Sequence, residues 1–220
     1  MNLQQENAPY QATLHNPFDE ALIARDRPSL RRILQELSAT RAPLDIIDNV
    51  VTPALEHIGT RWEEGTLALS QVYMSGRMCE EIVDSFFPHA DIVHANTPSI
   101  AIAVLHDCHI LGKRIVYSIL RTLGHNIVDY GHGIEVDTLV KQVQRDQIHI
   151  LLISTLMLPS AFMVRDVSQQ LKATHPHIKI IVGGAPFRFD EQLWQRVGAD
   201  AMGRTASDAI GLINRLCPSV

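Results

Sequence analysis

Hydrophobic and polar positions change their spacing near Pro98, and this change divides the chain into two parts. Before it, apolar residues recur every three or four positions, which predicts amphipathic helices. The expected helices cover residues 18–25, a stretch opening with Arg27-Pro28, residues 44–62 and residues 69–87. Pro53 lies inside the third helix and is expected to kink it, because proline lacks the N–H that a helix interior uses. Four helices with short connections predict a small bundle.

After residue 98, short apolar runs alternate with amphipathic segments. The expected strands are residues 99–106, 126–130, 148–155, 178–182 and 199–202. The expected helices are residues 112–123, 136–145, 161–173, 191–197 and 207–216. This alternation predicts an α/β, Rossmann-like (flavodoxin-like) fold with a five-stranded parallel, doubly wound sheet, preceded by an all-α helical-bundle cap. We expect a flexible tail at 1–16, the bundle at 17–92, a linker at 93–97 and the α/β domain at 98–217.

Composition narrows the function classes. The formal net charge of −5 argues against nucleic acid as a partner, because phosphate binding favours a basic face. No apolar run reaches the roughly 20 residues that span a bilayer, and the first residues lack a signal-peptide pattern. The three cysteines are widely spaced and odd in number, so they imply no disulfide framework. We therefore expect a cytoplasmic protein without a membrane or nucleic-acid partner.

The candidate chemistry lies in loops that follow the expected strands. The run from Asp107 through His109 to Gly112 follows the first strand, with the acid close enough to hydrogen-bond the imidazole. Later strands are followed by Ser154-Thr155-Leu156, by Gly183-Gly184 and by residues 203–206. In a doubly wound sheet, loops at the carboxyl ends of the strands line one crevice. The pattern predicts one extended ligand site, and the glycines suggest a large group lying against the backbone.

These motifs resemble the signature of cobalamin-binding domains. The resemblance rests on Asp107-x-His109-x-x-Gly112, Ser154-x-Leu156 and Gly183-Gly184, and residues 111–116 and 182–186 are close to the corrinoid-protein subfamily. Residues 59–65 and 69–72 are similar to the helical cap that precedes this domain in methionine synthase and in corrinoid methyl carriers. The resemblance covers the whole chain and implies cobalamin or another corrinoid, bound with its own lower base replaced by a protein histidine.

The resemblance also implies roles for individual residues. His109 would be the lower axial ligand to cobalt, Asp107 would orient its imidazole, and the hydroxyl of Ser160 would bond to that acid. Ser154 and Leu156 would form the pocket wall around the detached base. The nucleotide tail would be accommodated by Gly183, Gly184, Gly203, Thr205 and Ala206. The other residues expected to contact the cofactor are Cys108, Ile110, Leu111, Gly112 and Leu158. The residues that would lie over the upper, methyl-bearing face are Trp62, Leu69, Val72 and Tyr73.

Three positions depart from the family pattern. Leu158 stands where relatives often have threonine, which removes a polar contact. The thiol of Cys108 is an unexpected neighbour for cobalt. Ser70-Gln71 stands near the place where cobalamin photoreceptors carry a Glu-His pair, which argues against a light sensor.

The resemblance implies a methyl-carrier protein that acts between methyl-donor and methyl-acceptor methyltransferase subunits and is inactive alone. The alternative from another class is a cobalamin-dependent sensor or regulatory module, and a third is a flavodoxin-like response or nucleotide domain. Simpler readings also stand for single residues. Trp62 and Tyr73 could be bundle core, Gly183-Gly184 an ordinary turn, and Ser154 a cap.

Overall fold

The structure is a computed structural model that describes residues 16–87 and 98–216. The chain divides into two compact units, Met1–Phe86 and Phe87–Val220. The expected tail, apart from its last residue, and the expected linker lie outside the described residues. None of the described helices is long and apolar enough to cross a membrane.

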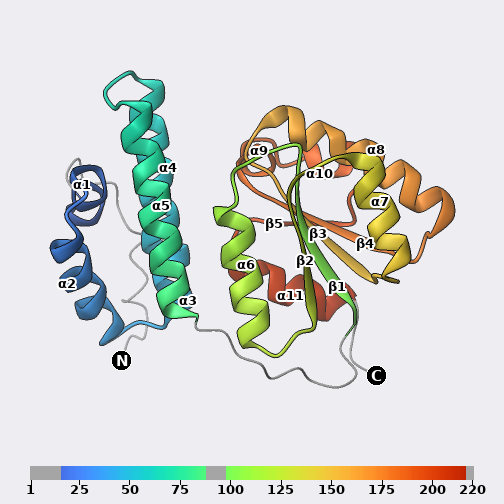
Figure 1. Ribbon diagram of the computed structural model, residues 1–220, viewed down its shortest axis with the longest axis horizontal. Coiled ribbons are helices and arrows are strands. Elements are labelled where there is room, and N and C mark those ends of the chain that lie inside the picture. The colour runs from blue at the N-terminus through green and yellow to red at the C-terminus, as the bar shows by residue number, and fades with distance from the viewer. Residues whose placement is uncertain (1–15, 88–97, 217–220) are drawn as a thin grey trace, which may run out of the picture. The chain divides into compact units, whose positions relative to one another are not determined.

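The first unit is built of helices, as predicted (Figure 1). The helices are α1 (Pro17–Ala24), α2 (Arg27–Ser38), α3 (Pro43–Ile46), a π-helical turn (Ile47–Val51), α4 (Thr52–Glu63) and α5 (Leu69–Phe86). Asn16 and Asp26 cap α1 and α2 by accepting a hydrogen bond from a backbone N–H of the first turn. Fully buried Phe18, Ile47 and Ile58 contribute to the packing among these helices.

The expected kink at Pro53 takes the form of the π-helical turn between α3 and α4. Thr52 N–H donates to the carbonyl of Ile47, five residues back, where an α-helix would reach back four. Pro53 follows at once, in the first turn of α4. One extra residue in the turn therefore accommodates the proline without ending the helical segment.

The second unit is an α/β fold with one parallel sheet (Figure 1). Its strands are β1 (Ile100–Leu105), β2 (Ile127–Ile134), β3 (Ile150–Ser154), β4 (Lys179–Gly183) and β5 (Ala201–Gly203). Its helices are α6 (Leu111–Thr122), α7 (Val136–Arg145), α8 (Leu158–Thr174), α9 (Ala185–Phe189), α10 (Leu193–Arg196) and α11 (Ala206–Leu216). The strand order β2-β1-β3-β4-β5 is the flavodoxin-like order, with its switch point between β1 and β3.

Two buried clusters, one on each face of the sheet, confirm the doubly wound arrangement. Ala101, Ala103 and Leu105 of β1 belong to the cluster with residues of α7, α8, α9 and α10. The alternate residues Ile100 and Ile102 belong to the cluster with residues of α6 and α11. Because side chains alternate between the faces of a strand, an apolar residue at every position of β1 serves both clusters.

The structure differs from the expected elements at two main places. Strand β2 continues to Ile134, beyond the expected range of 126–130. It lies at the edge of the sheet, next to β1 alone. Helix α9 was not expected, and its proline in the first helical turn is compatible with a helix.

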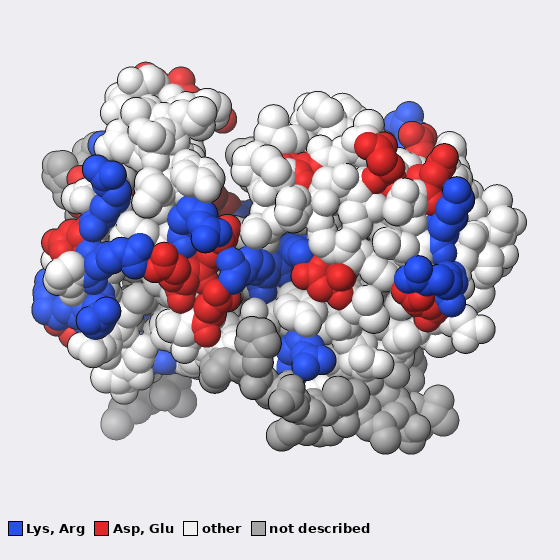
Figure 2. Space-filling model, in the orientation of Figure 1, with Lys and Arg blue, Asp and Glu red and all other residues white. Residues whose placement is uncertain are grey.

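Charged side chains of both signs are interspersed over the face shown in Figure 2. Many of them form ion pairs within one unit, such as Arg61–Glu20 in the first unit and Arg145–Asp146 in the second. Such exposed pairs contribute about 0–1 kcal/mol each. The stability of each unit therefore comes mainly from its buried apolar residues.

Candidate functional site

The Asp107 loop and the loop after β3 meet at the switch point of the sheet. Asp107 follows β1 and is 6% exposed. One carboxylate oxygen accepts from the backbone N–H and the Nδ1 of His109, at 3.0 and 2.5 Å. The other accepts from the backbone N–H groups of Leu156 and Met157, at 3.1 and 3.0 Å. These bonds use the roughly four acceptor positions of a carboxylate and tie the two loops together.

The protonation states of Asp107 and His109 follow from these partners. Burial raises the pKa of the Asp107 carboxyl, but the hydrogen bonds from His109, Met157 and Leu156 outweigh burial and hold the pKa below its ordinary value. The ionised carboxylate can only accept, so Nδ1 of His109 carries the proton. Nε2 of a neutral ring then keeps its lone pair. The His109 side chain is 49% exposed, so this ring is available to a ligand outside the fold.

Ser160 does not bond to Asp107, contrary to the role implied by the resemblance. The Ser160 hydroxyl donates instead to the backbone carbonyl of His106, at 3.4 Å. The backbone amides of Leu156 and Met157 already occupy the carboxylate oxygen that Ser160 would need. Ser160 therefore supports the loop through His106, the residue that precedes Asp107.

The same loop is held to the end of β2, a contact that sequence reasoning missed. Gly133 N–H donates to the carbonyl of Asp107 at 2.9 Å, and His106 N–H donates to the carbonyl of Ile134 at 3.2 Å. Nε2 of His106 lies 2.6 Å from a carboxylate oxygen of Glu135. His106 also has a φ of +47°, which is uncommon for a residue with a side chain. These contacts depend on the length of β2, which extends four residues beyond the expected end at Tyr130.

Neighbouring protein atoms leave little or no room for a side chain at three glycines of the site. A Cβ at Gly184 would lie 1.8 Å from the carbonyl oxygen of Thr155, and the residue has a φ of +117°. A Cβ at Gly112 would lie 3.0 Å from the hydroxyl oxygen of Ser154, and one at Gly183 would lie 3.3 Å from the carbonyl oxygen of Gly203. These contacts between protein atoms, which come from the close approach of adjacent loops, already require the glycines, and a large ligand lying against the same backbone stays a prediction.

Residues of the β5–α11 turn have structural roles. The hydroxyl of Thr205 accepts from the backbone N–H of Asp208, and the Asp208 carboxylate accepts from the N–H groups of Thr205 and Arg204. This reciprocal arrangement caps α11, which begins at Ala206. Gly203 ends β5 next to it.

Several predicted site residues share the open rim around His109. Cys108 is an exposed free thiol, and its sulfur lies within 4.8 Å of ligand atoms of Asp107 and His109. Ile110, Leu111 and Ser154 are partly buried. Leu156 and Leu158 are exposed, at 46% and 50%, and sequence reasoning missed Met157 beside them, at 49%. Three consecutive exposed apolar side chains form a surface suited to a bulky, partly apolar ligand.

The four remaining candidates belong to the first unit. Trp62 lies near the end of α4, and Leu69, Val72 and Tyr73 lie in the first two turns of α5. Trp62, Leu69 and Tyr73 are 45%, 64% and 65% exposed, and Val72 is partly buried. The alternative that Trp62 and Tyr73 form bundle core is therefore wrong. They are large apolar side chains that the bundle leaves open.

The residues around Asp107 and His109 fit a corrinoid held through one histidine. The group that could coordinate the metal is Nε2 of His109, and imidazole is a common transition-metal ligand. The other ring nitrogen, Nδ1, is hydrogen-bonded to the carboxylate of Asp107, which orients the ring. The hydroxyl of Thr155 is buried and has no hydrogen-bond partner among the described residues. Such a group requires a partner when it is kept from water. Thr155, which sequence reasoning did not select, is thus a further candidate for contact with a bound group.

Comparisons with known proteins show the family of this chain. A family profile described as B12 binding domain matches residues 98–212, and a second profile with the same description matches residues 14–85. Trimethylamine corrinoid protein 2 of Methanosarcina acetivorans is 27% identical over 210 residues, covering 88% of this chain and 95% of its own. Monomethylamine corrinoid protein 2 of Methanosarcina mazei is 26% identical over 206 residues, covering 89% and 94%.

A solved structure extends the comparison to the fold. The monomethylamine corrinoid protein of Methanosarcina barkeri superposes with a TM-score of 0.78 at 23% identity, covering 91% of this chain and 96% of the other. This likeness supports the same fold class, a helical unit followed by a parallel α/β unit.

Proposed function

Because the chain belongs to the family of B12-binding proteins, we propose that it carries a methyl group on a bound corrinoid between methyltransferase partners. The relatives are named for trimethylamine and monomethylamine, which favours a methylated amine as the methyl donor. The bound corrinoid supplies the cobalt atom that accepts and releases the methyl group. The chain supplies the ligand, the pocket and the surfaces on which its partners act.

The pairing of Asp107 with His109 carries this proposal. Nε2 of His109 is the nitrogen that would coordinate cobalt from below, in place of the cofactor's own base. Asp107 keeps the proton on Nδ1, fixes the plane of the ring and increases the basicity of Nε2. Both functions need an acid that stays ionised, and the four hydrogen bonds to Asp107 favour the ionised form.

The rim residues would hold the rest of the corrinoid. Leu156, Met157 and Leu158 would contact its apolar parts, and the buried hydroxyl of Thr155 would gain the partner it lacks in the described part of the chain. The other proposed contacts are Cys108, Ile110, Leu111, Gly112, Ser154, Gly183, Gly184, Gly203, Thr205 and Ala206. In this group the glycines act by letting adjacent loops approach each other, which shapes the pocket wall.

Trp62, Leu69, Val72 and Tyr73 are proposed to contact the methyl-bearing side of the corrinoid. Their support is the family resemblance together with the exposure of Trp62, Leu69 and Tyr73. Exposed aromatic and aliphatic side chains exclude water from a reactive group when they cover it. A partner must reach the same methyl group, so these residues would have to withdraw during each transfer.

Electron paramagnetic resonance of the Co(II) corrinoid tests the ligand directly. Protein labelled with ¹⁵N is combined with an unlabelled corrinoid, and the splitting of the cobalt lines by the axial nitrogen is recorded. A protein ¹⁵N ligand splits each line into two, whereas the cofactor's own ¹⁴N base splits it into three. We expect doublets that disappear in His109→Ala. Triplets in the wild type would refute coordination by His109.

Methyl transfer separates a carrier from a sensor. The corrinoid-loaded chain is reduced to the Co(I) state with a chemical reductant and mixed with a methylamine and a methylamine-specific methyltransferase. Methylation of cobalt, with release of the demethylated amine, is followed by the absorption spectrum. A carrier becomes methylated only when the partner is present, and stays unchanged alone. A protein that binds corrinoid but is never methylated by any such partner would favour the sensor alternative.

A further inference from the structure

Three histidines lie close together at the amino-terminal ends of β3 and β4, the opposite end of these strands from the Asp107 loop. His149 directly precedes β3, while His175 and His177 lie in the connection from α8 to β4. The ring centroid of His177 lies 6.5 Å from that of His149 and 5.9 Å from that of His175. The five residues of β3 separate this cluster from Ser154 by about 16 Å, at roughly 3.3 Å per residue. The cluster is therefore distinct from the corrinoid site.

The hydrogen bonds of Ser99 fix the tautomer of His149. The Ser99 hydroxyl donates its only proton to the carbonyl of Gln147, at 2.7 Å. It must then accept from Nδ1 of His149, which lies 2.7 Å away. His149 consequently carries its proton on Nδ1, and its Nε2 presents a lone pair on an exposed side chain.

Thr174 and Gln144 hold the ring of His175. The Thr174 hydroxyl donates to the carbonyl of Gln170 at 3.0 Å. Nδ1 of His175 lies 2.9 Å from that hydroxyl oxygen and 3.4 Å from the side-chain amide nitrogen of Gln144, which also donates to the hydroxyl at 3.0 Å. Two of the three rings are therefore held through Nδ1 by neighbouring polar side chains. Metal-binding histidines are oriented by this kind of outer hydrogen bond.

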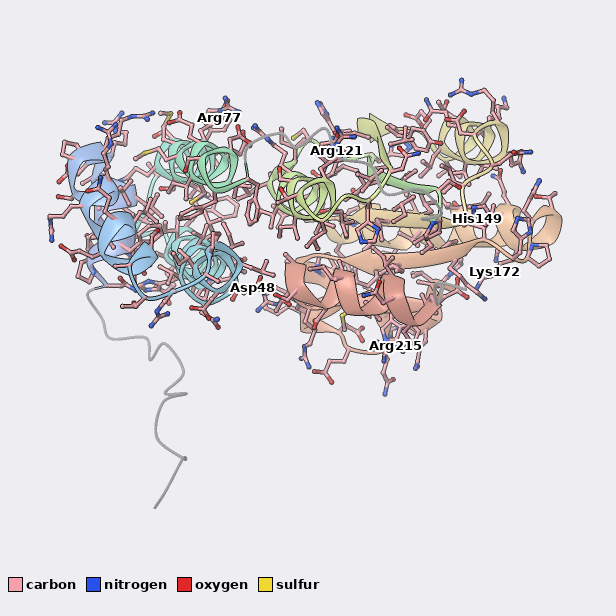
Figure 3. The ribbon with its side chains drawn as sticks, turned by 90° about the horizontal axis from the view of Figure 1, so that it is seen from below. Asp48, Arg77, Arg121, His149, Lys172 and Arg215 are labelled. Carbon is pink, nitrogen blue, oxygen red and sulfur yellow. The ribbon has the colours of Figure 1, made fainter. Side chains whose placement is uncertain are left out.

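The surroundings favour a cation that binds neutral nitrogen ligands. The three histidines line a groove of about 380 Å³ with apolar Val143, Ile148 and Ile178 and with the amides of Gln144 and Gln147. No carboxylate or ammonium group is among these lining residues. His149 lies at an end of the α/β unit (Figure 3).

We propose that His149, His175 and His177 form a binding site for a divalent transition-metal ion of the Zn²⁺ class, through Nε2 of His149 and His175 and a ring nitrogen of His177. Imidazole suits Zn²⁺, Cu²⁺ and Ni²⁺, and three histidines with one water complete a tetrahedral zinc site. Two imidazoles on such an ion have ring centroids about 5 Å apart, given zinc–nitrogen distances of about 2.0–2.1 Å. The ring of His177 must therefore move roughly 1 Å closer to each of the other two rings, which rotation of this exposed side chain allows. The ion would join the connections that precede β3 and β4.

Zinc titration of the full chain tests this site. The variant Cys108→Ser/His109→Ala serves as the reference, because Asp107, Cys108 and His109 form a second donor cluster. A chromophoric chelator that competes for Zn²⁺ gives the affinity and the stoichiometry. We expect the reference to bind one equivalent, and His177→Ala in the same background to weaken binding by more than 100-fold. Ser99→Ala should weaken it by about 10- to 100-fold, through loss of the hydrogen bond that orients His149.

Three further measurements test the interpretation. His132→Ala in the reference, which removes an exposed histidine of β2, should leave zinc affinity unchanged. Long-range ¹H–¹⁵N spectra should show His149 with the proton on Nδ1 before zinc is added, and the Nε2 signals of His149 and His175 shifted afterwards. Melting curves verify that each variant is folded. A reference that binds no zinc, or a His177→Ala variant that binds it equally well, would overturn the proposal.

Discussion

Substitution of Gly184 by alanine is the sharpest test of how the loops of the site are held together. The new Cβ would lie 1.8 Å from the carbonyl oxygen of Thr155 and 3.2 Å from its backbone nitrogen. Both are main-chain atoms, so no side chain can rotate away. At a φ of +117° and a ψ of 175°, moreover, alanine occupies a region that is essentially restricted to glycine.

The expected loss of stability follows from two contributions. The backbone conformation costs about 1–3 kcal/mol in a residue with a Cβ. Relief of the overlap moves Thr155 away, and with it the adjoining amides of Leu156 and Met157 that bond to Asp107. Loss of one hydrogen bond to a charged group costs about 1.5–3 kcal/mol. Together they predict about 3–6 kcal/mol, a large part of the 5–15 kcal/mol that a typical domain has.

Urea unfolding followed by tryptophan fluorescence measures this loss in the unit concerned. The chain has two tryptophans, and a Trp62→Phe background leaves Trp194, which packs against the core of the α/β unit, as reporter. Gly211→Ala in the same background is the matched control. A Cβ there meets nothing within 4 Å and the residue is helical, so this change should stabilise by about 0.5–1 kcal/mol. A Gly184→Ala variant within about 0.5 kcal/mol of its background would refute the argument.

Three other predictions concern the Asp107 loop. Asp107→Asn should destabilise the α/β unit at neutral pH. Because the pKa of Asp107 is lower in the folded protein than its ordinary value of about 3.8, the ionised carboxylate contributes its full stabilisation above about pH 3.8 and loses it as the pH falls through the folded-state pKa. The urea midpoints of the two proteins should therefore converge in acid. Ser160→Ala should cost under about 1.5 kcal/mol and leave the corrinoid spectrum unchanged, because the hydroxyl bonds to a backbone carbonyl and not to the acid; a spectrum altered as in Asp107→Asn would contradict this. Of the two described cysteines, the exposed Cys108 should react rapidly with iodoacetamide and be protected by bound corrinoid. Cys79 should react only when the protein unfolds, because burial raises the pKa of its thiol. Peptide mass spectrometry distinguishes the two sites.

The alternation of apolar and polar positions was sufficient to predict the fold class. Periods of three to four residues and short apolar runs are local properties, and they specify which segments become helices and which become strands. Because ligand loops of a parallel sheet follow the carboxyl ends of its strands, the pattern also identified the loops that carry Asp107, His109 and Gly184. Family resemblance then supplied the corrinoid, which periodicity alone could not name.

Contacts between distant segments were decided by the tertiary structure. The acceptor positions of Asp107 are filled by amides about 50 residues away, at Leu156 and Met157, and this displaces Ser160 from its expected partner. Likewise, His149 and His177 meet because β3 and β4 are neighbours in the sheet, although their sequence spacing gives no signal. Sequence periodicity reports which face of an element is buried. Which atoms meet across two loops depends on strand order, register and the exact start of each helix, and these are set only when the whole sheet is packed.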